Sequence, residues 1–241
     1  MAAWSPMDVP TPLDYFRSLV ASDAQFPLLE AAASLAQDPY PQTDVQSVLA
    51  QVDAWQVRLR GQLSRNADPI AKLRLVNRFF FDELGFAGNV NDYYAPENSY
   101  LHCVIDSRRG IPISLSVLWL ELAQGLGLQA QGVGFPGHFL VKVKLPQPHE
   151  GLIVLDPFTG QSLGREELLE RMGQWMGDAA SGLGTRKTDV VLTQHLQACS
   201  PRNMVLRMLH NLQEIYRSKP DAPTLGQVQQ RIAILERAPL A

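Results

Sequence analysis

Cysteine is scarce in this chain of 241 residues, which has only Cys103 and Cys199. No Cys-x-x-Cys spacing occurs, and the residues around the two thiols form no metal-ligand pattern. A chain of this size needs no disulfide, so its cysteine content fits a reducing cytoplasm. The rest of the sequence indicates no nucleotide or organic cofactor either. We therefore expect a cytoplasmic protein with no metal and no cofactor.

The sequence also lacks excess positive charge and long apolar runs. Its formal net charge is −3 and its pI about 5.9, whereas a nucleic-acid-binding protein needs a basic face. The one dense basic cluster, Arg108 and Arg109 with Lys142 and Lys144, is expected to be a solvated rim. No apolar stretch approaches about 18 residues, and the N-terminus has no basic segment followed by an apolar run. We expect no nucleic acid and no membrane as partners.

The composition that is present describes a globular protein, with 46% hydrophobic and 19% charged residues. The first 85 residues carry apolar positions at helical spacing, which predicts about four helices. Thr11 followed by Pro12, and Asp68 followed by Pro69, are typical of helix starts.

The centre of the chain changes pattern. A helix is predicted from Pro112 to about Gly125, and it is apolar on nearly all sides, so it belongs inside a domain. Short segments rich in β-branched residues follow and predict strands at 129–134, 139–145 and 152–155. A further helix is predicted at 165–176.

Two polar residues lie at the ends of these strands. His138 begins one strand, and Asp156 closes the next, 18 positions later. Two adjacent antiparallel strands would bring them side by side. Thiol enzymes combine such a pair with a cysteine at a helix N-terminus, where the helix dipole lowers the thiol pKa. The central helix begins without a cysteine, so the sequence holds only two thirds of a catalytic triad.

Four motifs together carry a resemblance to a known family: Asn98-Ser99-Tyr100-Leu101, Arg109-Gly110-Ile111-Pro112-Ile113-Ser114-Leu115-Ser116, Val133-Gly134-Phe135-Pro136-Gly137-His138-Phe139 and Leu155-Asp156-Pro157-Phe158. The chain resembles the transglutaminase-like core proteins of the bacterial SirB type. The resemblance implies an α+β fold with a papain-like, transglutaminase-type core, in which a central helix packs on an antiparallel sheet. It also implies a helical N-terminal part and a tetratricopeptide-like helix pair at the C-terminus.

We accordingly divide the chain into four parts. Residues 1–90 are the helical N-terminal part, and 91–176 are the transglutaminase-like core. Residues 177–199 are expected to be a flexible connector because they begin with a glycine-rich segment. Residues 200–241 are the helix pair, which must pack on the core or on a partner because two helices alone bury too little apolar area.

The resemblance also assigns site residues. His138 falls on the triad histidine and Asp156 on the triad aspartate, whereas Pro112 occupies the cysteine position. Proline has no nucleophile, and it is a favourable first residue for a helix. Four further residues are expected to line the substrate groove: Arg109, Gly110, Phe135 and Gly137.

Other nucleophiles would have to replace the missing thiol, and Ser114, Ser116 and Cys103 are the candidates. Serines this close to a helix start more often cap its first turn. A cysteine on an apolar segment is more often structural. His138 and Asp156 themselves could form a purely structural pair.

Three functions remain open on these grounds. The leading interpretation is a non-catalytic module whose groove binds a protein or peptide segment. The first alternative is a weak hydrolase or acyl transferase that uses His138 and Asp156 with Ser114, Ser116 or Cys103. The second alternative is a structural scaffold without a functional groove.

Overall fold

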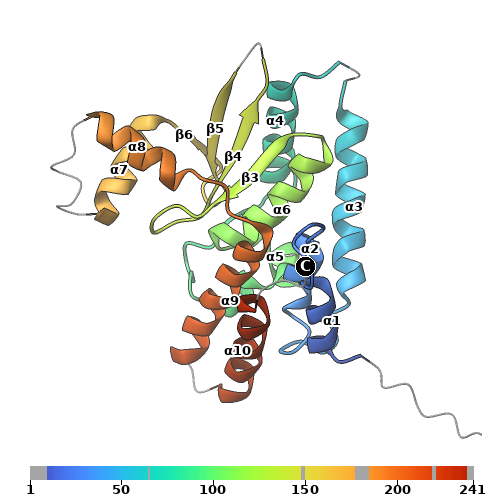
Figure 1. The fold of residues 1–241 in the computed structure, drawn as a ribbon. Coiled ribbons are helices and arrows are strands. Elements are labelled where there is room, and N and C mark those ends of the chain that lie inside the picture. Colours follow the sequence, from blue (N-terminus) through green and yellow to red (C-terminus); the bar gives the residue numbers. More distant parts are fainter. Residues whose placement is uncertain (1–9, 65, 148–149, 177–184, 219–220, 238–241) are drawn as a thin grey trace, which may run out of the picture.

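The computed structural model describes residues 10–64, 66–147, 150–176, 185–218 and 221–237. Most of these residues are helical (Figure 1). In chain order the α-helices are α1 (Pro12–Leu19), α2 (Leu28–Ser34), α3 (Val45–Gln62), α4 (Pro69–Asn77), α5 (Leu101–Ser107), α6 (Pro112–Gly125), α7 (Arg165–Met176), α8 (Thr185–His195), α9 (Pro201–Ser218) and α10 (Ala222–Glu236). A π-helical turn, η1 (Arg78–Glu83), extends α4, and a 3-10 turn, η2 (Pro96–Ser99), precedes α5.

The main sheet is an antiparallel meander in the order β3-β4-β5-β6. Its strands are β3 (Gln129–Val133), β4 (Leu140–Leu145), β5 (Gly151–Asp156) and β6 (Gln161–Leu163). A separate parallel pair joins β1 (Ala87–Gly88) to β2 (Arg109–Gly110). The predicted α+β class, with a central helix packed on an antiparallel sheet, is confirmed. The short strand β6 was not predicted.

Local capping explains where the N-terminal helices begin. The Thr11 side chain accepts the Asp14 N–H, and Pro12 fills the first position of α1. The Asp68 carboxylate accepts the Ala71 N–H at the start of α4. Four helices precede β1, as the apolar spacing predicted.

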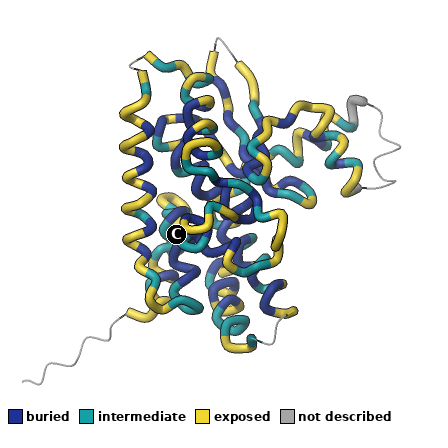
Figure 2. Tube along the Cα trace, turned by 180° about the vertical axis from the view of Figure 1, so that it is seen from behind, coloured by how far each residue is buried: buried dark blue, intermediate teal, exposed yellow. Residues whose placement is uncertain are grey.

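Helix α6 is the centre of the molecule. It is almost entirely buried, and one hydrophobic cluster around it runs from Phe16 in α1 to Leu235 in α10. In Figure 2 buried residues line the contacts between the elements, while exposed residues follow the outer side of α3. Because this cluster includes the N-terminal helices and the C-terminal pair, they fold against α6 as one body.

The C-terminal pair packs on the core, which confirms the docking expected for it. The buried side of α9 includes Met204, Val205, Met208, Leu209 and Leu212. Arg202 also donates hydrogen bonds to the carbonyl of Val20, directly after α1, and to that of Leu235 in α10. These contacts fix α9 beside the core, where its exposed side can form part of a surface site.

The opposite face of the sheet carries a second hydrophobic cluster. Its residues come from β3–β6, from the loop after β3, and from α7 and α8: Val133, Phe135, Leu140, Val154, Leu163, Leu168, Met172 and Leu192. Figure 1 shows α7 and α8 beside β6, on the side of the sheet away from α3.

Helix α8 corrects the expectation of a flexible connector over residues 177–199. The described part of that segment is helical from Thr185 to His195. Its Leu192 packs into the second cluster, and Lys142 of β4 donates a hydrogen bond to the Leu196 carbonyl. The sequence did not predict this helix, because the helix is stabilised by packing against distant elements rather than by a strong local helix propensity.

The basic cluster is not simply a solvated rim. Arg108 ends α5 in a left-handed conformation, with φ of 59°. Its guanidinium lies 5.0 Å from the centre of the Trp55 ring and 4.9 Å from that of Phe86. Burial lowers the pKa of Arg108. The arginine therefore stacks on aromatic side chains and joins α5 to the N-terminal helices.

Candidate functional site

The structure brings His138 and Asp156 together at one end of the main sheet. His138 lies in the turn that enters β4, and Asp156 is the last residue of β5. The two strands pair antiparallel, with Val141 opposite Leu155. His138 Nε2 lies 3.1 Å from Asp156 Oδ1. The two side chains are in contact at this distance, but His138 Nε2 makes no hydrogen bond of regular geometry.

Asp156 is the most constrained residue of this site, with 1% of its side chain exposed. Oδ1 accepts the Phe158 N–H at 2.9 Å, and Oδ2 accepts a hydrogen bond from Arg171 at 2.9 Å. Burial opposes ionisation of the carboxyl, but the contacts with His138 and Arg171 outweigh it and lower the pKa of Asp156 to about 2. The carboxylate is therefore ionised at neutral pH.

Two arginines that the sequence did not single out complete the surroundings. Arg171, in α7, forms an ion pair with Oδ2 of Asp156. Arg207, in α9, donates a hydrogen bond to the backbone oxygen of His138 at 2.9 Å. Both contacts join residues from separate elements, and no local sequence signal marks them. The His138 turn is thus held by the sheet and by the tail helix.

Pro112 and two buried serines occupy the start of α6. Pro112 is the first residue of the helix and is buried. Ser114 is fully buried, and its hydroxyl donates to the carbonyls of Asn98 and Ile111. Ser116 is equally buried and donates to the carbonyl of Pro112. Both serine hydroxyls therefore satisfy backbone groups and are closed to solvent.

Cys103 lies in a different environment. Its Sγ is 3.2 Å from Nε2 of the adjacent His102, on α5. Burial raises the pKa of the Cys103 thiol, and the nearby carboxylates of Glu97 and Asp106 raise it further. The contacts of this thiol are with His102 and Tyr40, not with His138. The structure thus does not bring Cys103 to the pair at the sheet end.

The four residues expected to line a groove occupy different places. Phe135 is fully buried in the second hydrophobic cluster and cannot line a groove. Gly110 is buried in β2, where an added Cβ would lie 2.8 Å from Ser114 Oγ. Arg109 is exposed and donates to the Gly85 carbonyl. Gly137 is exposed, with φ of 67°, and allows the turn that presents His138.

A cavity of about 490 Å³ opens beside the N-terminus of α6. One wall is formed by the loop residues Tyr93 and Tyr94, and Ile111 is the residue directly before α6. The other wall comes from α9: Asn211, Glu214, Ile215 and Ser218. We call this cavity the α6–α9 groove.

Aromatic contacts connect this groove to the His138 turn. The Tyr93 ring centre lies 5.9 Å from that of Phe158, which in turn lies 6.5 Å from that of His138. Burial raises the pKa of Tyr93, while Arg207 opposes the shift. These ring contacts link one wall of the groove to the His138 turn, although His138 itself does not line the groove.

Two further kinds of feature are absent from the part of the chain that the structure describes. No group of three or more His, Cys, Asp or Glu side chains could hold a metal ion there. None of the described helices combines the length and the apolar character needed to cross a membrane.

Known proteins give the family context of this geometry. A family profile described as transglutaminase-like superfamily matches residues 46–210. UPF0162 proteins from two strains of Xylella fastidiosa are 37% identical over 195 residues, which cover 80% of this chain and 66% of each relative. A UPF0162 protein of Vibrio cholerae is 28% identical over 182 residues, covering 76% of this chain and 63% of that protein.

A shorter match comes from human F-box only protein 21, which is 46% identical over 70 residues, or 29% of this chain and 11% of that protein. No solved structure matches the chain. The chain spans slightly less than two thirds of the length of its UPF0162 relatives. Because the family profile covers more than half of the chain, and its match includes α6, His138 and Asp156, the chain belongs to the transglutaminase-like superfamily.

Proposed function

We propose that this protein is a non-catalytic member of its superfamily, of the SirB type, that binds a protein or peptide segment in the α6–α9 groove. The observation that carries the proposal is the groove beside the start of α6, where Pro112 stands in place of a nucleophile. Peptide-binding grooves combine apolar walls with a few polar groups. Tyr93, Tyr94 and Ile215 supply apolar surface here, and the Asn211 amide supplies hydrogen-bonding groups.

The tail helix supports a binding role because it forms a wall of this groove. Asn211, Ile215 and Ser218 are spaced so that they share one side of α9. We propose that the α9–α10 pair acts as a tetratricopeptide-like extension of the binding surface, and that the protein works in the cytoplasm. The Asp156 carboxylate, held by Arg171 and close to His138, then has a structural role in keeping the groove end rigid.

The groove is tested with a display library of random peptides selected against the wild-type protein. Tyr94 is 75% exposed, so Tyr94→Ala removes part of one groove wall without disturbing the hydrophobic core. We expect it to weaken the selected peptides about tenfold or more, as truncation of an aromatic anchor does. Val57→Ala is the matched control, since Val57 is 66% exposed on α3 and lies outside the groove.

Two results would contradict the groove assignment. One is equal binding of the selected peptides to wild type and Tyr94→Ala. The other is a selection that yields no peptide at all, which would favour the structural scaffold.

The rival activity, a weak hydrolase or acyl transferase, depends on an activated nucleophile. Ser114 and Ser116 are closed to solvent, which leaves Cys103 as the only one of the three candidates that is partly exposed. Its partner His102 lies within 3.2 Å, but burial raises the thiol pKa. Nucleophilic cysteines have the opposite property, a lowered pKa.

We expect iodoacetamide to label Cys103 slowly at pH 6, with a rate that rises only as the pH approaches the raised pKa. His138→Ala should leave this profile unchanged, because the thiol does not contact His138. Mass spectrometry of the digested protein separates labelling at Cys103 from labelling at Cys199, which serves as the internal control. Fast labelling at pH 6 that disappears in His138→Ala would restore the enzymatic interpretation.

A further inference from the structure

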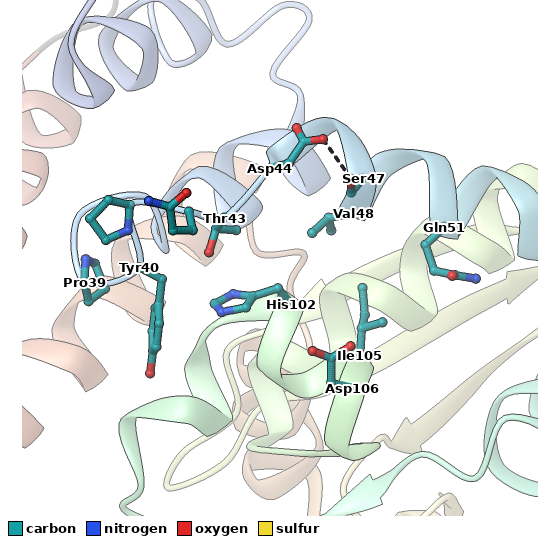
Figure 3. Close-up of a pocket in the computed structure, with 12 residues that line it drawn as sticks. Pro39, Tyr40, Thr43, Asp44, Ser47, Val48, Gln51, His102, Ile105 and Asp106 are labelled. Atoms are coloured by element: carbon teal, nitrogen blue, oxygen red, sulfur yellow. Dashed lines mark hydrogen bonds between the residues drawn. The ribbon is translucent and has the colours of Figure 1, made fainter.

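A second cavity, of about 720 Å³, lies on another part of the surface. It is bounded by the loop Pro39–Thr43, by the first turns of α3 and by α5 (Figure 3). It shares no lining residue with the α6–α9 groove. We call it the Tyr40 cavity.

The charge of the Tyr40 cavity is entirely negative. Asp44 and Asp106 line it, and no Lys or Arg does. Asp44 is already occupied, because it caps α3 by accepting the Gln46 N–H and the Ser47 hydroxyl. Asp106 is exposed, and among the described residues its carboxylate accepts no hydrogen bond and forms no ion pair, although Arg108 lies near enough to interact with it electrostatically. A free acceptor thus stands at the rim of the cavity.

The opposite side of the cavity is aromatic. The Tyr40 ring lies 4.8 Å from the His102 ring, centre to centre, at an interplanar angle of 71°. Figure 3 shows the His102 ring directed toward Tyr40, with Asp106 on the same helix as His102. Burial lowers the pKa of His102 below its usual value, so the ring is neutral at neutral pH and does not offset the carboxylates.

Apolar side chains also line the cavity. Val48 of α3 and Ile105 of α5 line the cavity and are 5% and 8% exposed. An aliphatic stem could pack on these two residues while its charged end reaches Asp106.

We propose that the Tyr40 cavity binds an arginine side chain carried by a peptide segment. A guanidinium fits the three features together: it stacks on aromatic rings, it donates two parallel hydrogen bonds to one carboxylate, and its stem is aliphatic. An ammonium matches the carboxylate but is more strongly hydrated and stacks less well. The cavity is much larger than one guanidinium, and the amides of Gln42 and Gln51 at its edge provide partners for peptide backbone.

The test compares two blocked tripeptides, glycine-arginine-glycine and glycine-citrulline-glycine, titrated into the full-length protein by calorimetry or NMR. Citrulline keeps the shape of arginine and removes its charge. We expect the arginine peptide to bind about fivefold more tightly, the size of one exposed ion pair plus one ring contact. Asp106→Asn should remove most of this preference and leave only the part that the ring contact provides. Titration of blocked arginine alone measures how much of the affinity the side chain provides without flanking backbone, and it should bind more weakly than the tripeptide.

Asp82→Asn is the matched control, because it removes the same charge from an exposed residue of η1 outside the cavity. Asp106 is exposed near the end of α5, so its replacement does not threaten the fold. The proposal is overturned if citrulline binds as well as arginine, or if Asp106→Asn loses no more affinity than Asp82→Asn. Binding of blocked arginine that equals that of the tripeptide would overturn the peptide source and identify a site for a free guanidinium compound.

Discussion

Replacing Asp38 by alanine is expected to destabilise the protein by about 3–5 kcal/mol, the usual cost of removing one partner of a buried ion pair. Asp38 pairs with Arg231 of α10, whose side chain is only 3% exposed. The Arg231 guanidinium also lies 5.5 Å from the centre of the Phe16 ring in α1. Without the carboxylate, this charge would stay buried between the N-terminal helices and the tail. Urea denaturation at neutral pH measures the loss.

A double variant separates the cost of an unpaired charge from the loss of a favourable interaction. Adding Arg231→Met to Asp38→Ala removes the buried charge and leaves an apolar side chain of similar length. We expect this pair of changes to recover most of the lost stability, because buried ion pairs can be replaced by apolar residues at little cost. If the double variant were as unstable as Asp38→Ala, the unpaired charge could not be the cause.

The helices were predictable where local and tertiary preferences agree. Pro112 favours a helix start, and the apolar residues that follow bury α6 on nearly all sides, so the predicted span from Pro112 to about Gly125 agrees with the structure. The strand β6 and the helix α8 were missed. Strand β6 has only three residues, and α8 is held by contacts with distant elements, such as that of Leu192 with the second cluster.

The same distinction applies to the site, where some residues could be predicted from the sequence and others could not. His138 and Asp156 could be paired from the sequence because they sit at the ends of neighbouring strands. Arg171 and Arg207 could not, since both reach the site from helices that follow the sheet in the chain. The groove needed the structure as well, because its second wall belongs to α9, more than 100 residues after Tyr94.

Replacing Asp156 tests how strongly its contacts with His138 and Arg171 stabilise the folded protein. Its pKa falls from the ordinary 3.8 to about 2 in the folded protein, and a shift of this size corresponds to about 2–3 kcal/mol of folding free energy. Asp156→Asn keeps the shape of the side chain but removes the charge that holds Arg171 and His138. We expect the variant to lose about this amount of stability at pH 7. Asp189→Asn is the control, because the Arg165–Asp189 pair is half exposed and contributes less than about 1 kcal/mol.

The direction of the Asp156 pKa shift determines how its contribution to stability changes with pH. A carboxyl with a lowered pKa stabilises the folded state fully at pH values above its unfolded pKa, and the contribution disappears as the pH falls through the folded pKa. The difference in unfolding free energy between wild type and Asp156→Asn should therefore be constant above about pH 5 and shrink between about pH 4 and pH 2. Urea denaturation of both proteins across this range measures it, and comparing the two cancels the other carboxylates that titrate there. A difference that stayed constant down to pH 2 would show that the Asp156 charge does not stabilise the fold.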